Sequence, residues 1–180
     1  MESIVCKSVG DYVDPVLDLV EKTYVESFPE EERRDFSLVR DLIREEPRFI
    51  LLVFLKDDRY VGFITGWRLG DYTYGEHFAI DPAARNGGIG AKAMKQFLDF
   101  CATPLVLEVE MPVDEMSRRR IGFYERLDFK LDDHVYHQPP YREGGEWLEM
   151  RLMTHGDLDL DLSFEQVRDC VHRHVYGVKR

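Results

Sequence analysis

The stretch of residues 78–90 reads FAIDPAARNGGIG, and it joins two segments of different character. Residues 72–80 form a run of strand length, which Asp81-Pro82 ends. After the glycines, apolar residues recur at helical spacing to about Phe100, namely Ile89, Ala93, Met94, Phe97, Leu98 and Cys101. The sequence therefore predicts a strand, a glycine-rich turn and a helix in direct succession.

A turn of this kind is suited to bind an anion. The first N–H groups of a helix have no partners within the helix, and the helix dipole places partial positive charge there. Glycine has no Cβ, so Gly87, Gly88 and Gly90 allow the backbone to approach a phosphate closely. The glycine spacing does not match the G-x-G-x-x-G of a dinucleotide fingerprint. It does not match a P-loop either, because Gly90 is followed by Ala91-Lys92 and not by Lys and then Ser or Thr. On spacing alone, a loop that merely turns the chain is almost as good an interpretation.

The hydrophobic patterns on either side of this turn predict the element order β-α-α-β-β-β-α-β-α-β-β-α. The expected strands lie at residues 4–8, 49–55, 60–69, 72–80, 105–109, 129–136 and 147–153. Asp14-Pro15 marks the start of the first helix, and Ser163 with Gln166 marks the start of the last. We expect one domain over residues 1–154 and an extension over 155–180 that packs on it or takes part in a homodimer contact.

Composition narrows the class of protein. The net charge of −11 argues against a nucleic-acid binder and agrees with a cationic substrate, although solubility alone explains it more simply. Cys6, Cys101 and Cys170 are widely spaced, which is typical of a reducing cytoplasm. The chain does not begin like a signal peptide, and its longest apolar run, residues 49–55, is too short to span a bilayer. We therefore expect a cytoplasmic protein without nucleic-acid or membrane partners.

Two motifs at the expected separation resemble those of the GNAT superfamily of N-acetyltransferases. Residues 78–82 leading into Arg85-x-x-Gly88-x-Gly90 are similar to its acyl-CoA signature, Q/R-x-x-G-x-G/A. Residues 122–129, GFYERLDF, resemble its F/L-Y-E-x-x-G-F segment. The element order also matches from about residue 4 to 154. The resemblance implies a fold of the α+β class (α/β three-layer type), with a mixed, mostly antiparallel sheet of six to seven strands and helices on both faces.

The resemblance implies that acetyl-CoA is the cosubstrate. Its pyrophosphate would be held by the backbone amides of Arg85, Asn86, Gly87, Gly88, Ile89 and Gly90. Backbone groups of Phe78, Ala79 and Ile80 would pair with pantetheine, and a free N–H there would stabilise the developing oxyanion. We expect no metal, because the histidines show neither H-x-x-x-H nor H-E-x-x-H spacing.

A catalytic role is implied for Tyr124, which matches the tyrosine that donates a proton to the departing CoA thiolate. A phenol with a pKa near ~10 still holds its proton at neutral pH. Spacing alone favours a core aromatic at this position, and the motif match favours the catalytic role. Three nearby residues depart from the family pattern, one of which is Arg120 in place of an Ala. Ser117 replaces the usual Asn but could still bond pantetheine, and Asp128 replaces a Gly but tolerates a left-handed conformation.

The attacking amine needs a base, because a primary ammonium has a pKa near ~10. Glu76 is the predicted base, since similar family members often carry an acid just before the cofactor-contacting end of this strand. A solvated glutamate at a strand edge is the alternative reading. His77 is the next residue and alternates to the opposite face of the sheet. Glu108 on the following strand is a third candidate.

The resemblance implies that the first two helices and the loop between the last strands line the acceptor side. Aromatic and acidic side chains there suit an amine, although ordinary packing explains each of them equally well. The candidates are Phe28, Glu31, Tyr136 and Tyr141, with Tyr24, Glu32, Gln138, Pro139 and Pro140 beside them.

The resemblance implies an N-acetyltransferase that moves an acetyl group from acetyl-CoA to a primary amine of a small molecule or peptide by direct attack. Two other readings remain open. One is a module of the same fold that binds or senses acyl-CoA without turnover, and the other is a scaffold that uses the fold for assembly.

Overall fold

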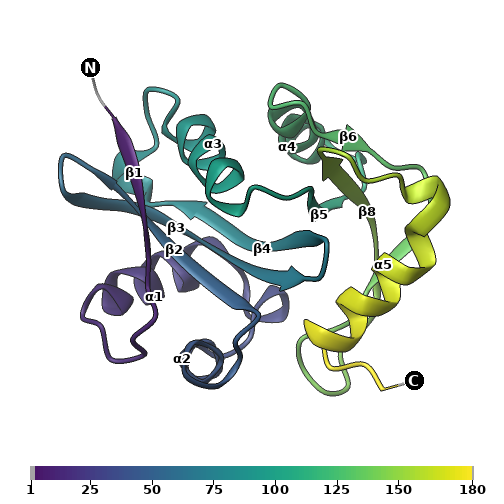
Figure 1. Cartoon of the computed structure of the whole chain (residues 1–180), viewed down its shortest axis with the longest axis horizontal. Helices are drawn as coiled ribbons and strands as arrows, with labels where there is room; N and C mark the ends of the chain where they lie inside the picture. The colour runs from purple at the N-terminus through teal and green to yellow at the C-terminus, as the bar shows by residue number, and fades with distance from the viewer. Residues whose placement is uncertain (1–2, 180) are drawn as a thin grey trace. The chain divides into compact units, whose positions relative to one another are not determined.

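The computed structural model describes residues 3–179 (Figure 1). Its α-helices are α1 (Val16–Ser27), α2 (Phe36–Glu45), α3 (Ile89–Cys101), α4 (Glu115–Glu125) and α5 (Leu160–His174), with short 3-10 helices η1 (Glu30–Glu32) and η2 (Pro82–Ala84). Its strands are β1 (Ile4–Ser8), β2 (Phe49–Lys56), β3 (Arg59–Leu69), β4 (Tyr72–Ile80), β5 (Leu105–Glu110), β6 (Lys130–Leu131), β7 (Tyr136–Gln138) and β8 (Leu148–His155). The predicted mixture of helices with a mostly antiparallel sheet is confirmed.

The chain forms two compact units. The first contains residues 3–68 and 75–102, and the second contains residues 69–74 and 103–179. The division runs through β4, whose first residues belong to the second unit and whose remainder belongs to the first. The expected domain over residues 1–154 with an extension over 155–180 stays a prediction.

In the first unit, β2 pairs antiparallel with both β1 and β3. Alternate side chains of β2 point to opposite faces. On one face, Leu51 and Val53 pack with α1 and α2 through Leu17, Val20, Tyr24, Phe36 and Val39. Figure 1 shows α1 and α2 on one side of these strands and α3 on the other. Coverage of both faces explains why β2 is apolar along almost its whole length.

The end of β4 lies close against β3. A Cβ at Gly62 of β3 would come within 2.5 Å of the Ala79 carbonyl oxygen and 2.9 Å of the Ile80 side chain. The Asp81 amide, just beyond β4, donates to the Val61 carbonyl over 2.8 Å. Glycine at position 62 therefore allows the close approach that sets where β4 ends and where the glycine-rich turn begins.

In the second unit, β8 pairs antiparallel with β5, β6 and β7. One long strand was expected over residues 129–136, but the structure has two short ones, so the described residues contain eight strands rather than six to seven. The reason is local. A side-chain oxygen of Asp132 accepts from the His134 amide over 3.0 Å, and this turn interrupts the strand.

Helix α5 packs on the second unit through its buried residues Leu160, Phe164, Val167, Val171 and His172. The Phe164 ring stacks on His134 at a centroid distance of 4.5 Å and meets Tyr136 edge-on at 6.5 Å. Among the described residues, no helix is long and apolar enough to cross a membrane.

Candidate functional site

The glycine-rich turn lies in the first unit and is exposed. The Asp81 side chain accepts from the Ala83 amide over 3.0 Å, which shapes η2 directly after β4. Gly87 and Gly88 then adopt left-handed conformations, with φ of 76° and 71°. A Cβ at either position would meet nothing within 4 Å. These glycines are therefore required by the backbone conformation, and the space above them is open to a ligand.

Helix α3 begins in this turn without a cap from the side chain of its N-cap residue, since that residue is a glycine. Gly88 is the N-cap residue and makes no side-chain cap hydrogen bond, whereas Asp114 and Asp159 cap α4 and α5 with their carboxylates. Ile89 is buried and anchors the helix, while Gly88 is exposed. The start of α3 thus presents backbone donors and the positive end of the helix dipole to open space, which fits a diphosphate.

Arg85 folds back toward the end of β4. Its Nε donates to the Ile80 carbonyl over 2.9 Å, and its Nη2 lies 3.5 Å from the Ser27 hydroxyl. Nη1 takes part in neither contact. The side chain therefore braces the turn and still carries a positive charge beside it, where Asn86 is also exposed.

The three residues expected to contact pantetheine, Phe78, Ala79 and Ile80, form the last residues of β4. Ala79 and Ile80 are buried, and Phe78 meets the Phe54 ring edge-on at 6.1 Å. The structure thus places them directly before the turn. Their role in binding pantetheine stays a prediction.

Tyr124 lies near the end of α4 in the second unit and is half-buried between two rings. The centroids of Phe123 and Phe129 lie 5.1 Å and 5.2 Å from its ring. Within residues 3–179, its hydroxyl makes no hydrogen bond, so its proton is not committed elsewhere. Burial raises the pKa of Tyr124 to about 12, although the Arg120 charge opposes this rise. The phenol therefore stays protonated at neutral pH, as an acid must.

Two of the three departures from the family pattern, Asp128 and Ser117, have different outcomes. Asp128 has φ of 68°, so it adopts the left-handed conformation expected of the glycine it replaces. Ser117 forms a capping box with Asp114 at the start of α4. Its hydroxyl donates to the Asp114 carbonyl over 3.0 Å and accepts from the Asp114 amide over 3.1 Å. Since its one hydrogen is used in the cap, Ser117 is not available as a donor to pantetheine in this conformation.

Glu76, the predicted base, lies in a buried ion pair in the first unit. Arg34 places Nη1 2.9 Å from Oε1 and Nη2 2.8 Å from Oε2, and the Trp67 indole donates to Oε1 over 2.8 Å. Burial raises the pKa of Glu76, but Arg34, His77 and the Trp67 hydrogen bond together outweigh it and lower the pKa to about 2. A carboxylate so strongly stabilised is a weak proton acceptor, and this environment does not favour the role we predicted.

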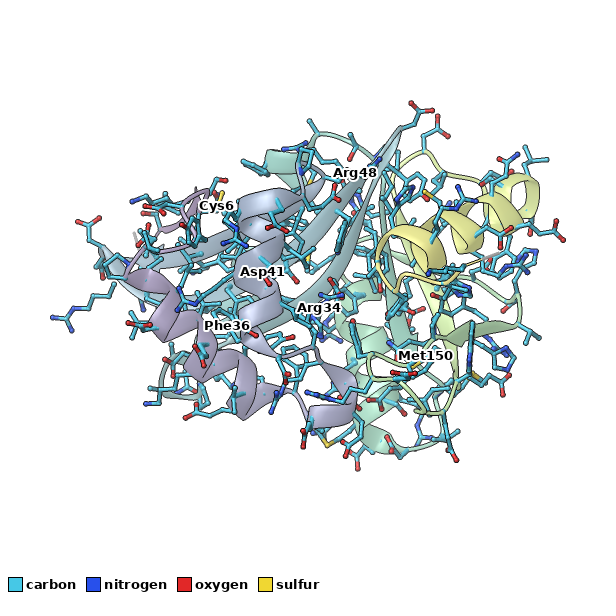
Figure 2. All side chains as sticks on the ribbon, turned by 90° about the horizontal axis from the view of Figure 1, so that it is seen from below. Cys6, Arg34, Phe36, Asp41, Arg48 and Met150 are labelled. Carbon is cyan, nitrogen blue, oxygen red and sulfur yellow. The ribbon has the colours of Figure 1, made fainter. Side chains whose placement is uncertain are left out.

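Arg34 belongs to the connector between α1 and α2, where it is labelled in Figure 2. From its composition, the charged run of residues 30–34 predicts a solvated connector, but Arg34 is only 8% exposed. Its carbonyl also accepts from the buried Tyr24 hydroxyl over 2.9 Å. The expectation was wrong for this residue because its charge has a buried partner on β4.

His77 is buried beside Glu76, and burial lowers its pKa. Its Nε2 lies 2.9 Å from the Glu32 carbonyl oxygen, so this nitrogen carries the proton and donates. Its ring lies 4.6 Å from Phe28 and 5.2 Å from Tyr24. Glu76 and His77 therefore both fasten the connector between α1 and α2 to β4, which is a structural role.

Glu108, the third candidate base, lies on β5 in the second unit. Its Oε1 accepts from the hydroxyls of Tyr74 and Tyr176 and, over 3.4 Å, from the Gln138 amide. Its Oε2 is buried and has no partner within 3.5 Å among the described residues, and the nearby Tyr136 hydroxyl also interacts with this carboxylate and lowers its pKa. Burial raises the pKa of Glu108, and the donated hydrogen bonds oppose this rise without cancelling it. The environment makes Glu108 a stronger proton acceptor than Glu76.

The expected acceptor residues differ in exposure. In the first unit, Glu31 is exposed and Phe28 is half-buried against His77. In the second unit, Tyr136 is fully buried, and Tyr141 lies with its ring centroid 5.1 Å from that of Tyr176. Their contact with an acceptor stays a prediction.

Three residues that shape these environments were missed. Arg34 was read as part of a solvated run, and Tyr74 and Tyr176 as ordinary strand and tail residues. A tyrosine before Gly177 and an arginine at the end of a charged run carry no local signal of their partners.

One group of possible metal ligands occurs among residues 3–179. Asp132, His134 and Asp161 bring ligand atoms within 4.8 Å of one another, and Asp161 is exposed. The Nδ1 atom of His134 already lies 2.9 Å from Oδ2 of Asp132, a hydrogen bond that raises the pKa of His134. This arrangement is explained by the turn that separates β6 from β7. Our expectation of no metal stays a prediction.

Comparison with known proteins agrees with these features. The model of the acetyltransferase (GNAT) family matches residues 13–129. A Bacteroides thetaiotaomicron structure described as an acetyltransferase from the GNAT family is 41% identical, with a TM-score of 0.93, over 97% of this chain and 99% of that one. No curated protein matches the chain.

Two more distant structures share the fold. Arabidopsis thaliana Naa50, in complex with the bisubstrate analogue CoA-Ac-MVNAL, has a TM-score of 0.61 at 18% identity, over 86% of this chain and 99% of that one. The ribosomal-protein-S18-alanine N-acetyltransferase from Escherichia coli has a TM-score of 0.58 at 17% identity, over 87% of this chain and 97% of that one. The extent of the family match and the 41% identical relative are decisive, and the chain belongs to the GNAT family of acetyltransferases.

Proposed function

We propose that the protein transfers an acetyl group from acetyl-CoA to a primary amine of a small molecule or peptide by direct attack. The observation that carries this proposal is the uncapped, exposed start of α3 at the GNAT acyl-CoA signature. Acetyl-CoA supplies the activated acetyl group as a thioester. Main-chain amides within residues 85–90 hold its diphosphate, except that of Asn86, which donates to the Ala84 carbonyl over 2.9 Å, and the Arg85 charge lies beside them.

Tyr124 serves as the general acid in this proposal. Its hydroxyl is uncommitted among the described residues, and its pKa of about 12 keeps it protonated at neutral pH. It donates that proton to the thiolate sulfur as the C–S bond breaks. A positioned acid of this kind contributes typically about 10²- to 10⁴-fold to a rate.

Glu108 replaces Glu76 as the general base. A base is most effective when its pKa lies near the working pH, and burial raises the pKa of Glu108, whereas the pKa of Glu76 is about 2. Oε2 of Glu108 accepts the proton of the acceptor ammonium, which frees the nitrogen electron pair for attack. Glu76 keeps a structural role through its ion pair with Arg34.

The acceptor class follows from the chemistry of the chain and from its distant relatives. Naa50 was solved with a peptide bisubstrate analogue, and another structure of this fold is a spermidine N-acetyltransferase chimera from Vibrio cholerae and human SSAT. Phe28, Glu31 and Tyr141 offer aromatic and acidic groups that suit an amine.

We propose that the enzyme is cytoplasmic and needs no metal. We also propose that it forms a homodimer, which light scattering would test.

The direct test is an assay of CoA thiol release from acetyl-CoA with a panel of polyamines, amino acids and peptides with free N-termini. We expect amine-dependent release with at least one member. Binding of CoA without release across the whole panel would instead indicate a sensing module, and failure to bind CoA would indicate a scaffold.

A further inference from the structure

The carboxylate of Glu108 is held by donors from three separate parts of the second unit. Tyr74 comes from β4, Gln138 from β7, and Tyr176 from the segment that follows α5. The two tyrosine hydroxyls also lie 3.2 Å from each other. The hydrogen bonds from these three groups all reach Oε1, while Oε2 is buried, has no partner within 3.5 Å among residues 3–179, and has the Tyr136 hydroxyl as the remaining neighbour that interacts with the carboxylate. The two oxygens of one carboxylate are thus in different environments.

The segment carrying Tyr176 is fixed by its own backbone. Gly177 is left-handed, with φ of 70°, and the Val178 amide donates to the His172 carbonyl over 2.9 Å. This turn closes the end of α5 and sets the direction of the tyrosine. The His172 ring is in turn anchored by a 3.0 Å hydrogen bond from Nε2 to the His137 carbonyl. Tyr176 is therefore placed by packing and not by chance contact of a loose tail.

We propose that Tyr176 is a positioning residue for acetyl transfer, fixing Oε1 of Glu108 so that Oε2 is the oxygen that accepts the ammonium proton. This inference rests on the proposed function of Glu108. In the step, the N–H bond of the ammonium breaks, the Oε2–H bond forms, and the freed electron pair attacks the thioester carbonyl. The segment after α5 lies outside residues 13–129, which the family model matches, so the extension becomes part of the site.

The groups around Glu108 set the direction of the expected effect. A hydroxyl that donates to a carboxylate stabilises its charged form, whereas burial destabilises it. The titratable groups that face this cluster within the second unit are Tyr74, Tyr136, Tyr141 and His172. At neutral pH Tyr136 and Tyr176 are uncharged, since burial raises the pKa of each well above its usual value. Loss of the Tyr176 hydroxyl therefore raises the pKa of Glu108 further.

The experiment compares Tyr176→Phe with the wild-type protein and with Tyr72→Phe. Tyr72 lies on the same strand as Tyr74, and its buried hydroxyl interacts with Cys170 and not with Glu108, which makes it a matched control. The measurement is the pH profile of kcat with a working amine. We expect the acid limb to move to higher pH by about one unit in Tyr176→Phe, with the KM for acetyl-CoA unchanged. An unmoved limb, or an equal movement in Tyr72→Phe, would overturn the inference.

A second readout separates this inference from the proposed function. Carbon-13 NMR of labelled glutamate carboxyls, with Glu108→Gln to assign the signal, follows the titration of Glu108 without any turnover. A midpoint that rises in Tyr176→Phe supports the contact, and a midpoint equal to wild type overturns it. If the wild-type protein acetylates no amine, the proposed function fails while the titration still reports whether Tyr176 holds Glu108.

Discussion

Arg34 and Glu76 form a two-pronged ion pair, with both guanidinium nitrogens within 2.9 Å of the two carboxylate oxygens. The glutamate side chain is fully buried and that of the arginine is 9% exposed. The pair joins the connector between α1 and α2 to β4, just before the strand reaches the glycine-rich turn. The pair thus holds in place the strand that leads into the glycine-rich turn.

Breaking this pair should cost stability. Glu76→Ala leaves the Arg34 charge buried without its main partner, and we expect the free energy of unfolding to fall by about 3–5 kcal/mol in urea titrations. Glu115→Gln is the control, because Glu115 forms an exposed pair with Arg119 that is worth less than about 1 kcal/mol. Equal, small losses in both variants would contradict the structural role.

The same pair predicts a pH dependence of stability. The pKa of Glu76 is lowered from its usual 4.5 to about 2 in the folded protein, so the unfolded chain binds the proton more tightly. The stabilisation is therefore complete above about pH 4.5 and is lost as the pH falls from there toward 2. Urea titrations across this window should show a loss in the wild-type protein that is absent in Glu76→Ala. Parallel curves for the two proteins would contradict the prediction.

Substitution of Gly88 should weaken CoA binding. A valine there must adopt a left-handed conformation and puts a side chain into the open space at the start of α3. We expect calorimetry to show at least about tenfold weaker binding, or roughly 1.4 kcal/mol. Gly70→Val is the matched control, because Gly70 is also left-handed with open space around it but lies in the β3–β4 turn. Unchanged affinity in Gly88→Val would refute the assignment.

Removal of the Tyr124 hydroxyl should affect chemistry more than binding. Tyr124→Phe keeps the ring contacts with Phe123 and Phe129, so the fold should be preserved. We expect kcat to fall about 10²-fold or more, with little change in the Kd for CoA. Because the pKa of Tyr124 is about 12, the wild-type rate should show no loss from its ionisation up to about pH 11. Wild-type turnover by the variant would remove Tyr124 from the mechanism.

The fall of kcat at low pH, which is the acid limb of its pH profile, should identify the general base. If Glu108 accepts the proton, kcat falls as the pH drops through the raised pKa of Glu108, so the midpoint lies above 4.5. A base with the pKa of Glu76 would instead remain active down to about pH 2. Glu108→Gln should lower kcat and abolish the limb. A limb that persists in this variant would show that another group titrates.

The fold could be predicted from the sequence where the signals are local. The apolar spacing of residues 89–101 indicates helix α3 directly, and Asp81-Pro82 marks the end of the strand before it. The division of the expected strand into β6 and β7 could not be seen, because it depends on one turn made by the Asp132 side chain. Hydrophobic patterns continue through such a turn and hide it.

The site could be predicted only in part, for the same reason. The turn at residues 85–90 and the tyrosine motif are contiguous in sequence. Arg34 and Glu76 are 42 residues apart, and Glu108 and Tyr176 are 68 apart, so their pairing arises only on folding. The ion pair with Arg34 lowers the pKa of Glu76, whereas burial raises the pKa of Glu108 against the opposing hydrogen bond from Tyr176, and the sequence shows neither environment.

The central claim is that main-chain donors at the start of α3 hold the diphosphate of CoA. A crystal structure of the protein with CoA tests this most directly. We predict diphosphate oxygens within about 3.2 Å of amide nitrogens among residues 85–90. CoA bound with its diphosphate away from these amides would contradict the account.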